Sequence, residues 1–204
     1  MSDKPVGYMT RLLGLDMETT GLAYNADDPS FNPRTKEYYQ PVSVGLIVVD
    51  ADTLKTIEEL YIEIKWDGKS VWNKKAEQVH GLTKEYLQEH GVTYEDAVVQ
   101  IGNLLLDHWG PDSPIHILGH NPWFDLCFFR RLMRTQDIDL KFGNKMIDTN
   151  SLGFAVFGTY NSTDLFDMIG VRHSSGKHNA LTDARNSVEV VRRTRMLADQ
   201  CFGG

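Results

Sequence analysis

The stretch Asp16-Met17-Glu18-Thr19-Thr20-Gly21-Leu22 directly follows the short apolar run Leu12-Leu13-Gly14-Leu15. The apolar run predicts a buried strand, with Asp16 at or near its end. Residues two apart on an extended chain point to the same face, so Asp16 and Glu18 would present two carboxylates side by side. Gly21 permits a tight turn or a close backbone approach to a ligand. The stretch therefore predicts an acidic site at the end of a strand.

The remaining secondary-structure signals predict an α/β fold. Strands come first along the chain, and strands and helices then mix, which predicts a mixed central sheet flanked by helices on its faces. A polar loop longer than a typical connection is expected over 24–40. Further strands are expected at 42–49, 60–64 and 115–118, a strand or turn at 145–149, and helices at 93–109, 122–135 and 182–197.

Bulk composition favours one globular domain, spanning 1–204 with a core of about 11–195, since the chain has 204 residues. Hydrophobic residues make up 41% and charged residues 24%, which is ordinary for a globular protein. Cys127 and Cys201 lack the spacing of a zinc site or a disulfide framework, so a reducing compartment is expected. No secretory signal or membrane-spanning run is evident, and we expect a cytoplasmic protein without membrane association.

The net charge of −7 is unusual for a protein that binds nucleic acid, because phosphate binding favours a basic surface. Carboxylates that bind divalent cations would account for part of this charge. Two arginine clusters also offer local positive charge, and a solvated helix face is the simpler interpretation of each. These clusters are Arg130, Arg131 and Arg134, and Arg192, Arg193 and Arg195.

Two more carboxylates are expected early in helices. Asn121-Pro122 suits an N-cap followed by a first helical residue, which would place Asp125 in the first turns. Asp183 would lie early in the last helix, with His178 in the loop before it. Taken singly, each acid is explained by the helix dipole, and a histidine such as His178 is more often a surface or core residue.

Taken together, these residues have the chemistry of phosphodiester hydrolysis. Four converging carboxylates can hold two divalent cations roughly 3.5–4 Å apart, which activate water and neutralise the leaving oxygen. Mg²⁺ prefers such oxygen ligands. Histidine titrates near neutrality and can take a proton from water. A zinc hydrolase is disfavoured, because no His/Cys cluster with zinc spacing is present.

The three stretches resemble the motifs of the DEDDh, or DnaQ-like, 3′→5′ exonucleases, which include the proofreading epsilon subunits of bacterial polymerases, ribonuclease T and Trex-type enzymes. Asp-x-Glu-Thr-x-Gly-Leu matches 16–22, Asn-x-x-Phe-Asp matches 121–125, and His-x₄-Asp matches 178–183. The tyrosine branch of this superfamily would have tyrosine at position 179, which is Asn179 here. The resemblance therefore indicates the histidine branch.

This resemblance implies a ribonuclease H-like fold and a full set of site residues. It implies that His178 is the general base and that two divalent cations, Mg²⁺ or Mn²⁺, are held by the four catalytic carboxylates Asp16, Glu18, Asp125 and Asp183. The segment 79–83 resembles the family's His-Gly-Ile-Thr segment near the terminal nucleotide, with Leu82 in place of isoleucine, and Asp148 resembles a structural aspartate. The implied substrate-binding residues are Thr19, Gly21, Leu22, His80, Asn121 and Phe124.

The resulting hypothesis is a metal-dependent 3′→5′ exonuclease that releases nucleoside 5′-monophosphates from single-stranded 3′ ends. DNA is favoured, because the region from Ser162 to Leu165 resembles proofreading subunits. RNA trimming, as in ribonuclease T, is the alternative, since no residue of the sequence indicates whether the site accepts or excludes a 2′-OH. A non-catalytic nucleic-acid-binding module is less favoured, because all five motif positions are filled. A polymerase-associated subunit stays open, although the end at Gly204 favours a self-contained enzyme or a homodimer.

Overall fold

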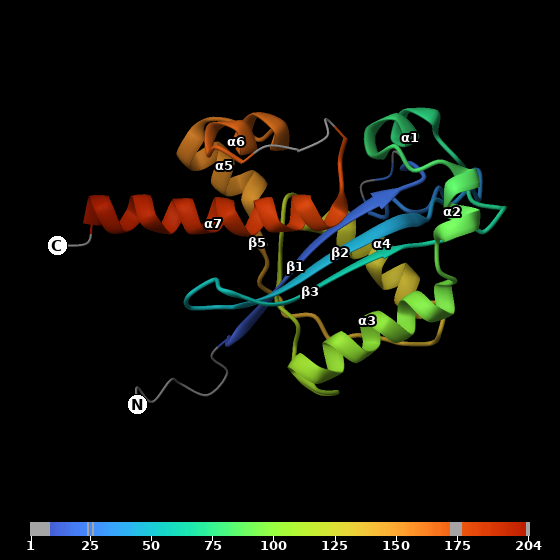
Figure 1. Ribbon diagram of the computed structural model, residues 1–204, viewed down its shortest axis with the longest axis horizontal. Helices are drawn as coiled ribbons and strands as arrows, with labels where there is room; N and C mark the ends of the chain where they lie inside the picture. Colours follow the sequence, from blue (N-terminus) through green and yellow to red (C-terminus); the bar gives the residue numbers. More distant parts are fainter. Residues whose placement is uncertain (1–8, 24, 26, 172–176, 203–204) are drawn as a thin grey trace.

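The computed structural model describes residues 9–23, 25, 27–171 and 177–202. Its elements alternate as the sequence predicts, with strands first and then helices and strands mixed (Figure 1). In chain order they are β1 (Arg11–Thr19), β2 (Pro41–Asp50), β3 (Thr56–Glu63), α1 (Lys74–His80), α2 (Lys84–His90), α3 (Tyr94–Trp109), β4 (Ile117–Gly119), α4 (Pro122–Arg134), β5 (Ile147–Asp148), α5 (Thr149–Phe157), α6 (Ser162–Met168) and α7 (Ala180–Phe202).

The strands form one mixed sheet in the order β3-β2-β1-β4-β5. β2 runs antiparallel to both β1 and β3, whereas β4 is parallel to β1 and β5 is parallel to β4. The predicted α/β fold with a mixed central sheet is confirmed. β1 lies at the centre, between β2, with which it pairs along its whole length, and β4, with which it pairs at Leu13 and Gly14.

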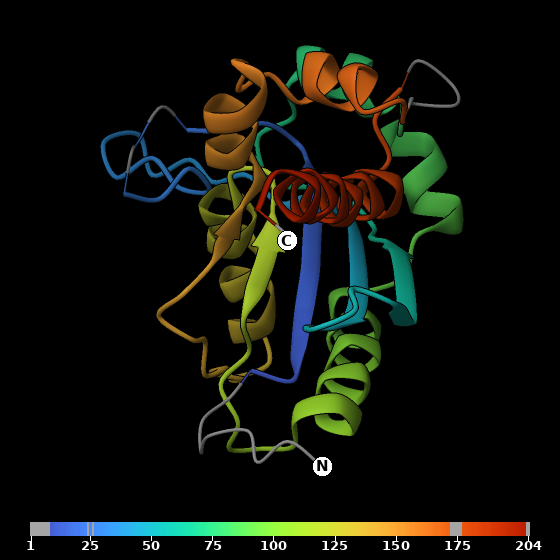
Figure 2. The same ribbon diagram turned by 90° about the vertical axis from the view of Figure 1, so that its left-hand side faces the viewer.

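Helices cover both faces of this sheet, and β1 contributes alternate residues to the two layers. Leu13, Leu15 and Met17 pack in the larger core with α3 and α4. Leu12 packs on the opposite face, in the smaller core with Val188 and other residues of α7. Figure 1 shows α7 on one side of the strands and α3 on the other, and Figure 2 shows α7 crossing the strands. By the two-residue period, Asp16 and Glu18 face the α7 layer.

Several expected boundaries differ from the structure. β1 does not end near Asp16 but continues to Thr19, because β2 offers pairing partners as far as Pro41. α7 is longer than expected at both ends. The helices α1, α2, α5 and α6 were not among the expected helices, since elements of 7, 7, 9 and 7 residues are too short for a helical period to stand out. None of the described helices combines the length and apolar character that a membrane span requires.

The start of α7 packs directly against Gly45, which pairs with Asp16 across β1 and β2. A Cβ atom at Gly45 would lie 2.2 Å from the carbonyl carbon of Ala180 and 2.3 Å from the nitrogen of Leu181. Ala180 is the first residue of α7. The missing side chain at Gly45 therefore lets the start of α7 rest on the sheet beside Asp16.

We expect Gly45→Ala to lower the free energy of unfolding by about 1–3 kcal/mol, because the new methyl group must displace the backbone of α7. Chemical denaturation measures the change. Gly102→Ala in α3 is the matched control: its added Cβ meets no atom within 4 Å, and alanine favours a helix over glycine by up to about 1 kcal/mol. A Gly45→Ala protein as stable as the control would contradict the close packing of α7.

Candidate active site

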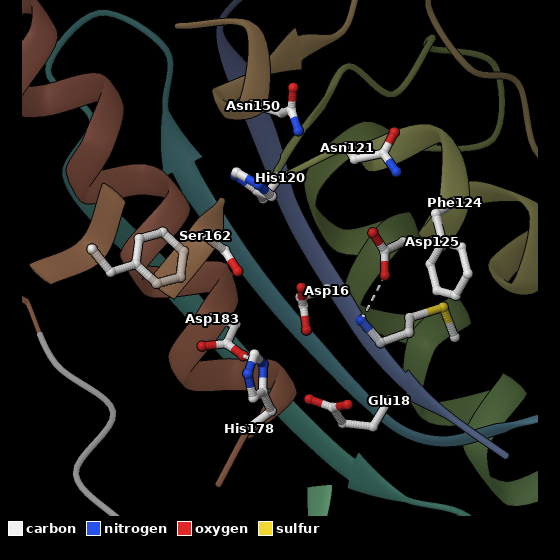
Figure 3. Close-up of a pocket in the computed structure, with 12 residues that line it drawn as sticks. Asp16, Glu18, His120, Asn121, Phe124, Asp125, Asn150, Ser162, His178 and Asp183 are labelled. Carbon is white, nitrogen blue, oxygen red and sulfur yellow. Dashed lines mark hydrogen bonds and ion pairs between the residues drawn. The ribbon is translucent and has the colours of Figure 1, made fainter. Parts of the chain in front are cut away.

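Asp16 and Glu18 lie side by side on the α7 face of β1 and line a cavity of about 280 Å³ (Figure 3). Strand alternation places them there, as the sequence predicts. Glu18 is 9% exposed, and Asp16 is partly open to the cavity. The two side chains are thus held by the central strand of the sheet.

Asp125 reaches the same cavity from α4. Leu13 donates its N–H to the carbonyl of His116 on the β4 side of β1. β4 then ends at Gly119, and the N–H of Met17 on that same side donates to Oδ1 of Asp125 at 2.9 Å instead. The carboxylate therefore satisfies a backbone donor that β4 leaves unpaired, which fixes the first turn of α4 against β1.

The entry into α4 differs from the expectation. Pro122 is the first helical residue and Asn121 occupies the N-cap position, both as predicted, but the side chain of Asn121 does not cap the helix. Asn121 adopts the left-handed conformation, with φ 55° and ψ 53°, and its side chain makes no capping hydrogen bond to the described chain. Its N–H instead donates to Asp148 at 2.9 Å. Asp148 also accepts from the N–H of Asn150 at the start of α5, so its predicted structural role is confirmed.

Asp183 and His178 come from the start of α7 and the loop before it. Asp183 is 5% exposed in the first turn. Nδ1 of His178 lies 3.0 Å from Oδ2 of Asp183, and its side chain is 33% exposed. The backbone N–H of His178 donates to the carbonyl of Val79 in α1 at 3.1 Å. His178 is therefore held between α1 and α7, with one edge of its ring toward Asp183.

The five predicted catalytic side chains converge on one cavity, although they come from β1, α4 and the start of α7 (Figure 3). Ligand atoms of Glu18, His178 and Asp183 all lie within 4.8 Å of one another. Asp16 and Asp125 line the same cavity. The structure thus brings together residues that are far apart in the sequence: Asp16 and Asp183 are separated by 167 positions.

The buried carboxylates perturb one another. Burial raises the pKa of Asp16 well above its usual range, and the charges of Asp125, Glu18 and Asp183 raise it further. Burial likewise raises the pKa of Asp125, and it raises the pKa of Glu18 to about 7, with Asp183 adding to the rise and His178 opposing it. The hydrogen bond to Asp183 raises the pKa of His178. Without a cation, this cluster resists full ionisation.

The donor set fits divalent cations. Four carboxylates offer only oxygen atoms, which suit hard cations such as Mg²⁺, and no cysteine lines the cavity. Burial and mutual repulsion disfavour the ionised carboxylates, and bound cations would favour them. Raised pKa values are therefore expected for the carboxylates of a cation site when no cation is bound. The residues that would hold the ions are Asp16, Glu18, Asp125 and Asp183.

The predicted substrate-binding residues divide into two groups. Asn121 and Phe124 line the cavity, as expected of groups that contact a bound nucleotide. Thr19 is the last residue of β1, and Gly21 and Leu22 follow it; none of the three is among the cavity-lining residues. Gly21 has φ +143°, and a Cβ there would lie 2.9 Å from side-chain atoms of both Asn73 and Tyr39. The glycine is therefore required by close protein packing at this turn.

His80 is buried at the end of α1 and does not line the cavity. Its Nδ1 accepts from the N–H of Leu82 at 3.0 Å, and its ring packs edge-on to Trp72. Burial lowers the pKa of His80 to about 4, so the ring is neutral near pH 7. The preceding residue, Val79, holds the backbone of His178. The segment 79–83 thus adjoins the site through its contact with the loop that carries His178.

One wall of the cavity was not anticipated. His120 joins it to α5 and the loop that follows, since Nδ1 lies 3.2 Å from Oγ1 of Thr149 and Nε2 lies 3.0 Å from the carbonyl oxygen of Tyr160. Burial lowers the pKa of His120. His120 precedes the second motif directly, and Asn161 caps α6 by accepting from the N–H of Asp164, so both parts of this wall had an available signal in the sequence. The cavity-lining residues that the sequence did not reveal as such are Met17, His120, Asn150, Ser162 and Phe166.

Comparison with solved structures defines the fold. The chain superposes on E. coli exonuclease I in complex with a dT13 oligonucleotide with a TM-score of 0.75 and 17% identity, over 96% of this chain and 43% of that one. The nuclease domain of 3′hExo, a DEDDh family member bound to rAMP, gives a TM-score of 0.65 and 16% identity, over 96% and 95% of the two chains. With the mixed sheet, these similarities confirm the ribonuclease H-like fold.

The family is shown by the sequence itself. The sequence profile of the Exonuclease family, of ribonuclease T type, matches residues 13–191. The chain therefore belongs to this exonuclease family, and the resemblance to DEDDh-type 3′→5′ exonucleases is confirmed. No curated protein sequence matches the chain. The chain spans less than half the length of E. coli exonuclease I.

Folding raises the pKa of Glu18 from 4.5 to about 7, so the protonated carboxyl favours the fold at low pH and this stability is lost as the pH rises through 7. In EDTA, we expect the unfolding free energy of the unsubstituted protein to fall relative to Glu18→Gln by on the order of 3 kcal/mol as the pH rises from about 4.5 to above 7. Denaturant titrations at several pH values measure the difference.

Excess Mg²⁺ provides the second arm of this experiment, because bound cations compensate the ionised carboxylates. We expect Mg²⁺ to flatten the pH dependence of the unsubstituted protein and to have a smaller effect on Glu18→Gln. A stability difference between the two proteins that stays constant with pH in EDTA would contradict the crowded arrangement of carboxylates.

Proposed function

We propose that this chain is a two-metal-dependent 3′→5′ exonuclease that removes nucleoside 5′-monophosphates from the 3′ end of single-stranded DNA. The observation that carries this proposal is the convergence of four carboxylates and one histidine on a single cavity at the end of β1. Family membership supports the class of reaction. The substrate, the product and the identity and number of the ions are the parts that the proposal adds.

Each group in the cavity has a role in this reaction. Asp16, Glu18, Asp125 and Asp183 hold the divalent ions, Mg²⁺ or Mn²⁺, which supply activation of water and charge neutralisation at the phosphate. His178 accepts the proton of the attacking water, and the hydrogen bond that its Nδ1–H donates to Asp183 stabilises the charged imidazolium that results. Its ring is partly exposed toward the cavity, where the water would bind.

The terminal nucleotide would lie between two walls of the cavity. Phe124 offers an aromatic surface for its base, backed by Phe128 with ring centroids 5.0 Å apart. Asn121 lies at the same rim, and Ser162 and Asn150 offer polar groups from the opposite wall. In our proposal this pocket is supported by Thr19 at the end of β1, by Gly21 and Leu22 in the loop after it, and by His80 at the end of α1.

DNA is proposed over RNA because the segment from Ser162 to Leu165 resembles proofreading subunits, and Ser162 lines the cavity. The solved structures include both kinds of ligand. E. coli exonuclease I holds a dT13 oligonucleotide, and a 3′-exonuclease is described in 3′-end-specific recognition of a histone mRNA stem-loop. The same fold therefore accommodates either backbone, and RNA trimming is the second candidate.

The test uses matched DNA and RNA oligonucleotides labelled at the 5′ end, with Mg²⁺ or Mn²⁺. We expect a ladder that shortens from the 3′ end, faster on DNA, and that EDTA abolishes. Asp16→Ala should slow it at least about a hundredfold, because an electrostatic group at the reacting phosphate is lost. His178→Ala should slow it about 10²–10⁴-fold through loss of the general base.

Glu95→Gln is the matched control, since it removes an exposed carboxylate at the start of α3, outside the cavity. It should degrade DNA at the unsubstituted rate. A single internal cut, or full activity in Asp16→Ala, would refute the exonuclease proposal. Faster shortening of RNA than of DNA would replace the proposed substrate by the second candidate.

A further inference from the structure

The two arginine clusters of the sequence differ in how the fold uses them. Arg192 donates to the carbonyl of Leu54 and pairs with Glu189. The other two members of this α7 cluster are also engaged: one guanidinium pairs with Glu189 and the other donates to the carbonyl groups of the β2–β3 turn. Two of these arginines therefore tie α7 to the β2–β3 turn, and the third is paired within α7.

The cluster on α4 is not used in this way. Among the described residues, no carboxylate forms an ion pair with Arg130 or Arg131, whose guanidinium groups lie against aromatic rings. Arg134 pairs with Asp139 at 3.3 Å, but both side chains are well exposed, at 64% and 81%. Such an exposed pair contributes little. The α4 cluster thus presents positive charge to solvent on a chain whose net charge is −7.

These arginines belong to a stripe along one face of α4. Trp123, Cys127, Arg130 and Arg134 follow one another at intervals of four, three and four residues, which places them on one side of a helix. Together with Arg131 they line a surface hollow of about 380 Å³. Trp123 is 42% exposed. At about 1.5 Å per residue, the stripe runs about 16 Å along the helix.

The stripe begins at the rim of the catalytic cavity. Asn121 and Phe124, which flank Trp123 in the sequence, both line that cavity. From Trp123 the stripe leads away from the carboxylates toward the C-terminal end of α4. A strand whose last nucleotide occupies the cavity can therefore continue along this face without crossing the carboxylates.

Two acids share this hollow with the arginines. Asp27 and Asp28 belong to the loop after β1 and line the same hollow. The carboxylate of Asp28 accepts hydrogen bonds from the N–H and Oγ of Ser30, so it is held by its own loop. Asp27 is exposed. Their charge would repel phosphates from the loop side and confine a strand to the arginine side.

We infer that the Trp123–Arg134 face of α4 binds the single-stranded DNA substrate on the 5′ side of the nucleotide being removed. This inference rests on the proposed function. Arg130 and Arg134 contact phosphates, Arg131 adds to the positive field, and the exposed ring of Trp123 stacks on a base. The face combines positive charge with an aromatic platform, which are the two components of single-strand grooves.

Binding in EDTA tests this face separately from catalysis. The probe is a 5′-fluorescein-labelled single-stranded DNA of about twelve nucleotides, within the range of a single-strand groove. We expect Arg130→Gln with Arg134→Gln to weaken binding about tenfold or more and to reduce the slope of log Kd against log salt by about 1.4, since each phosphate contact on a single strand contributes about 0.7. Fluorescence anisotropy over a salt series gives both values.

Matched variants separate this surface from general charge effects. Arg193→Gln also removes one arginine, but from the paired cluster on α7, and should bind DNA as the unsubstituted protein does. Asp27→Asn should bind DNA more tightly. Trp123→Ala should weaken binding about tenfold, and Trp123→Phe should recover most of the loss. Retained affinity after replacement of Arg130 and Arg134, or an equal loss in Arg193→Gln, would overturn the inference.

Hydrolysis distinguishes this inference from the proposed function. The small ester p-nitrophenyl thymidine 5′-phosphate reaches only the cavity, so the double arginine variant should lose at least tenfold more kcat/KM on the oligonucleotide than on the ester. Equal losses would overturn the inference and leave the exonuclease intact. Absence of hydrolysis of either substrate by the unsubstituted protein, with arginine-dependent binding retained, would refute the proposed function alone.

An RNA oligonucleotide of the same sequence completes the test. Phosphates and a stacked base do not report the 2′-OH, so the double variant should lose a similar factor on RNA. A loss confined to RNA would overturn the assignment of this face to DNA. Lysine at positions 130 and 134 should restore binding, because the positive charges return.

Discussion

The constraint on which the rest of this structure depends is the burial of several carboxylates in one place. Each loses hydration, and each repels the others, so the cluster around Asp16 opposes folding unless cations are bound. Two apolar cores, one on each face of the sheet, hold these groups together. The packing of α4 and α7 against β1 thus offsets the unfavourable free energy of the acidic cluster.

β1 links the parts of the site because its two faces and its edge make different contacts. Its α4 face is apolar and anchors the larger core, and its α7 face carries Asp16 and Glu18. Its edge beyond the end of β4 donates to Asp125. Gly45 on the neighbouring strand leaves room for the start of α7, which brings Asp183 to the same point. Backbone geometry therefore sets the spacing of the carboxylates.

Charge is divided over the surface in a way that net charge conceals. The paired arginines on α7 serve the fold, since their partners are carbonyl groups and Glu189. The arginines on α4 lie beside the catalytic cavity and largely lack such partners among the described residues. An acidic exonuclease can in this way combine a carboxylate-rich cavity with a local path for a polyanion.

The sequence by itself determined the strands, the long helices and the carboxylate motifs, because the alternation of strands and the caps of helices are local properties. It placed Asp16 and Glu18 on one face and Asp125 and Asp183 early in helices. Only the tertiary structure decided that Asp125 pairs with the N–H of Met17, that Asn121 takes a left-handed conformation, and that α5 and α6 supply a wall. It also decided which arginines are paired. These features depend on contacts between distant segments, which no local pattern encodes.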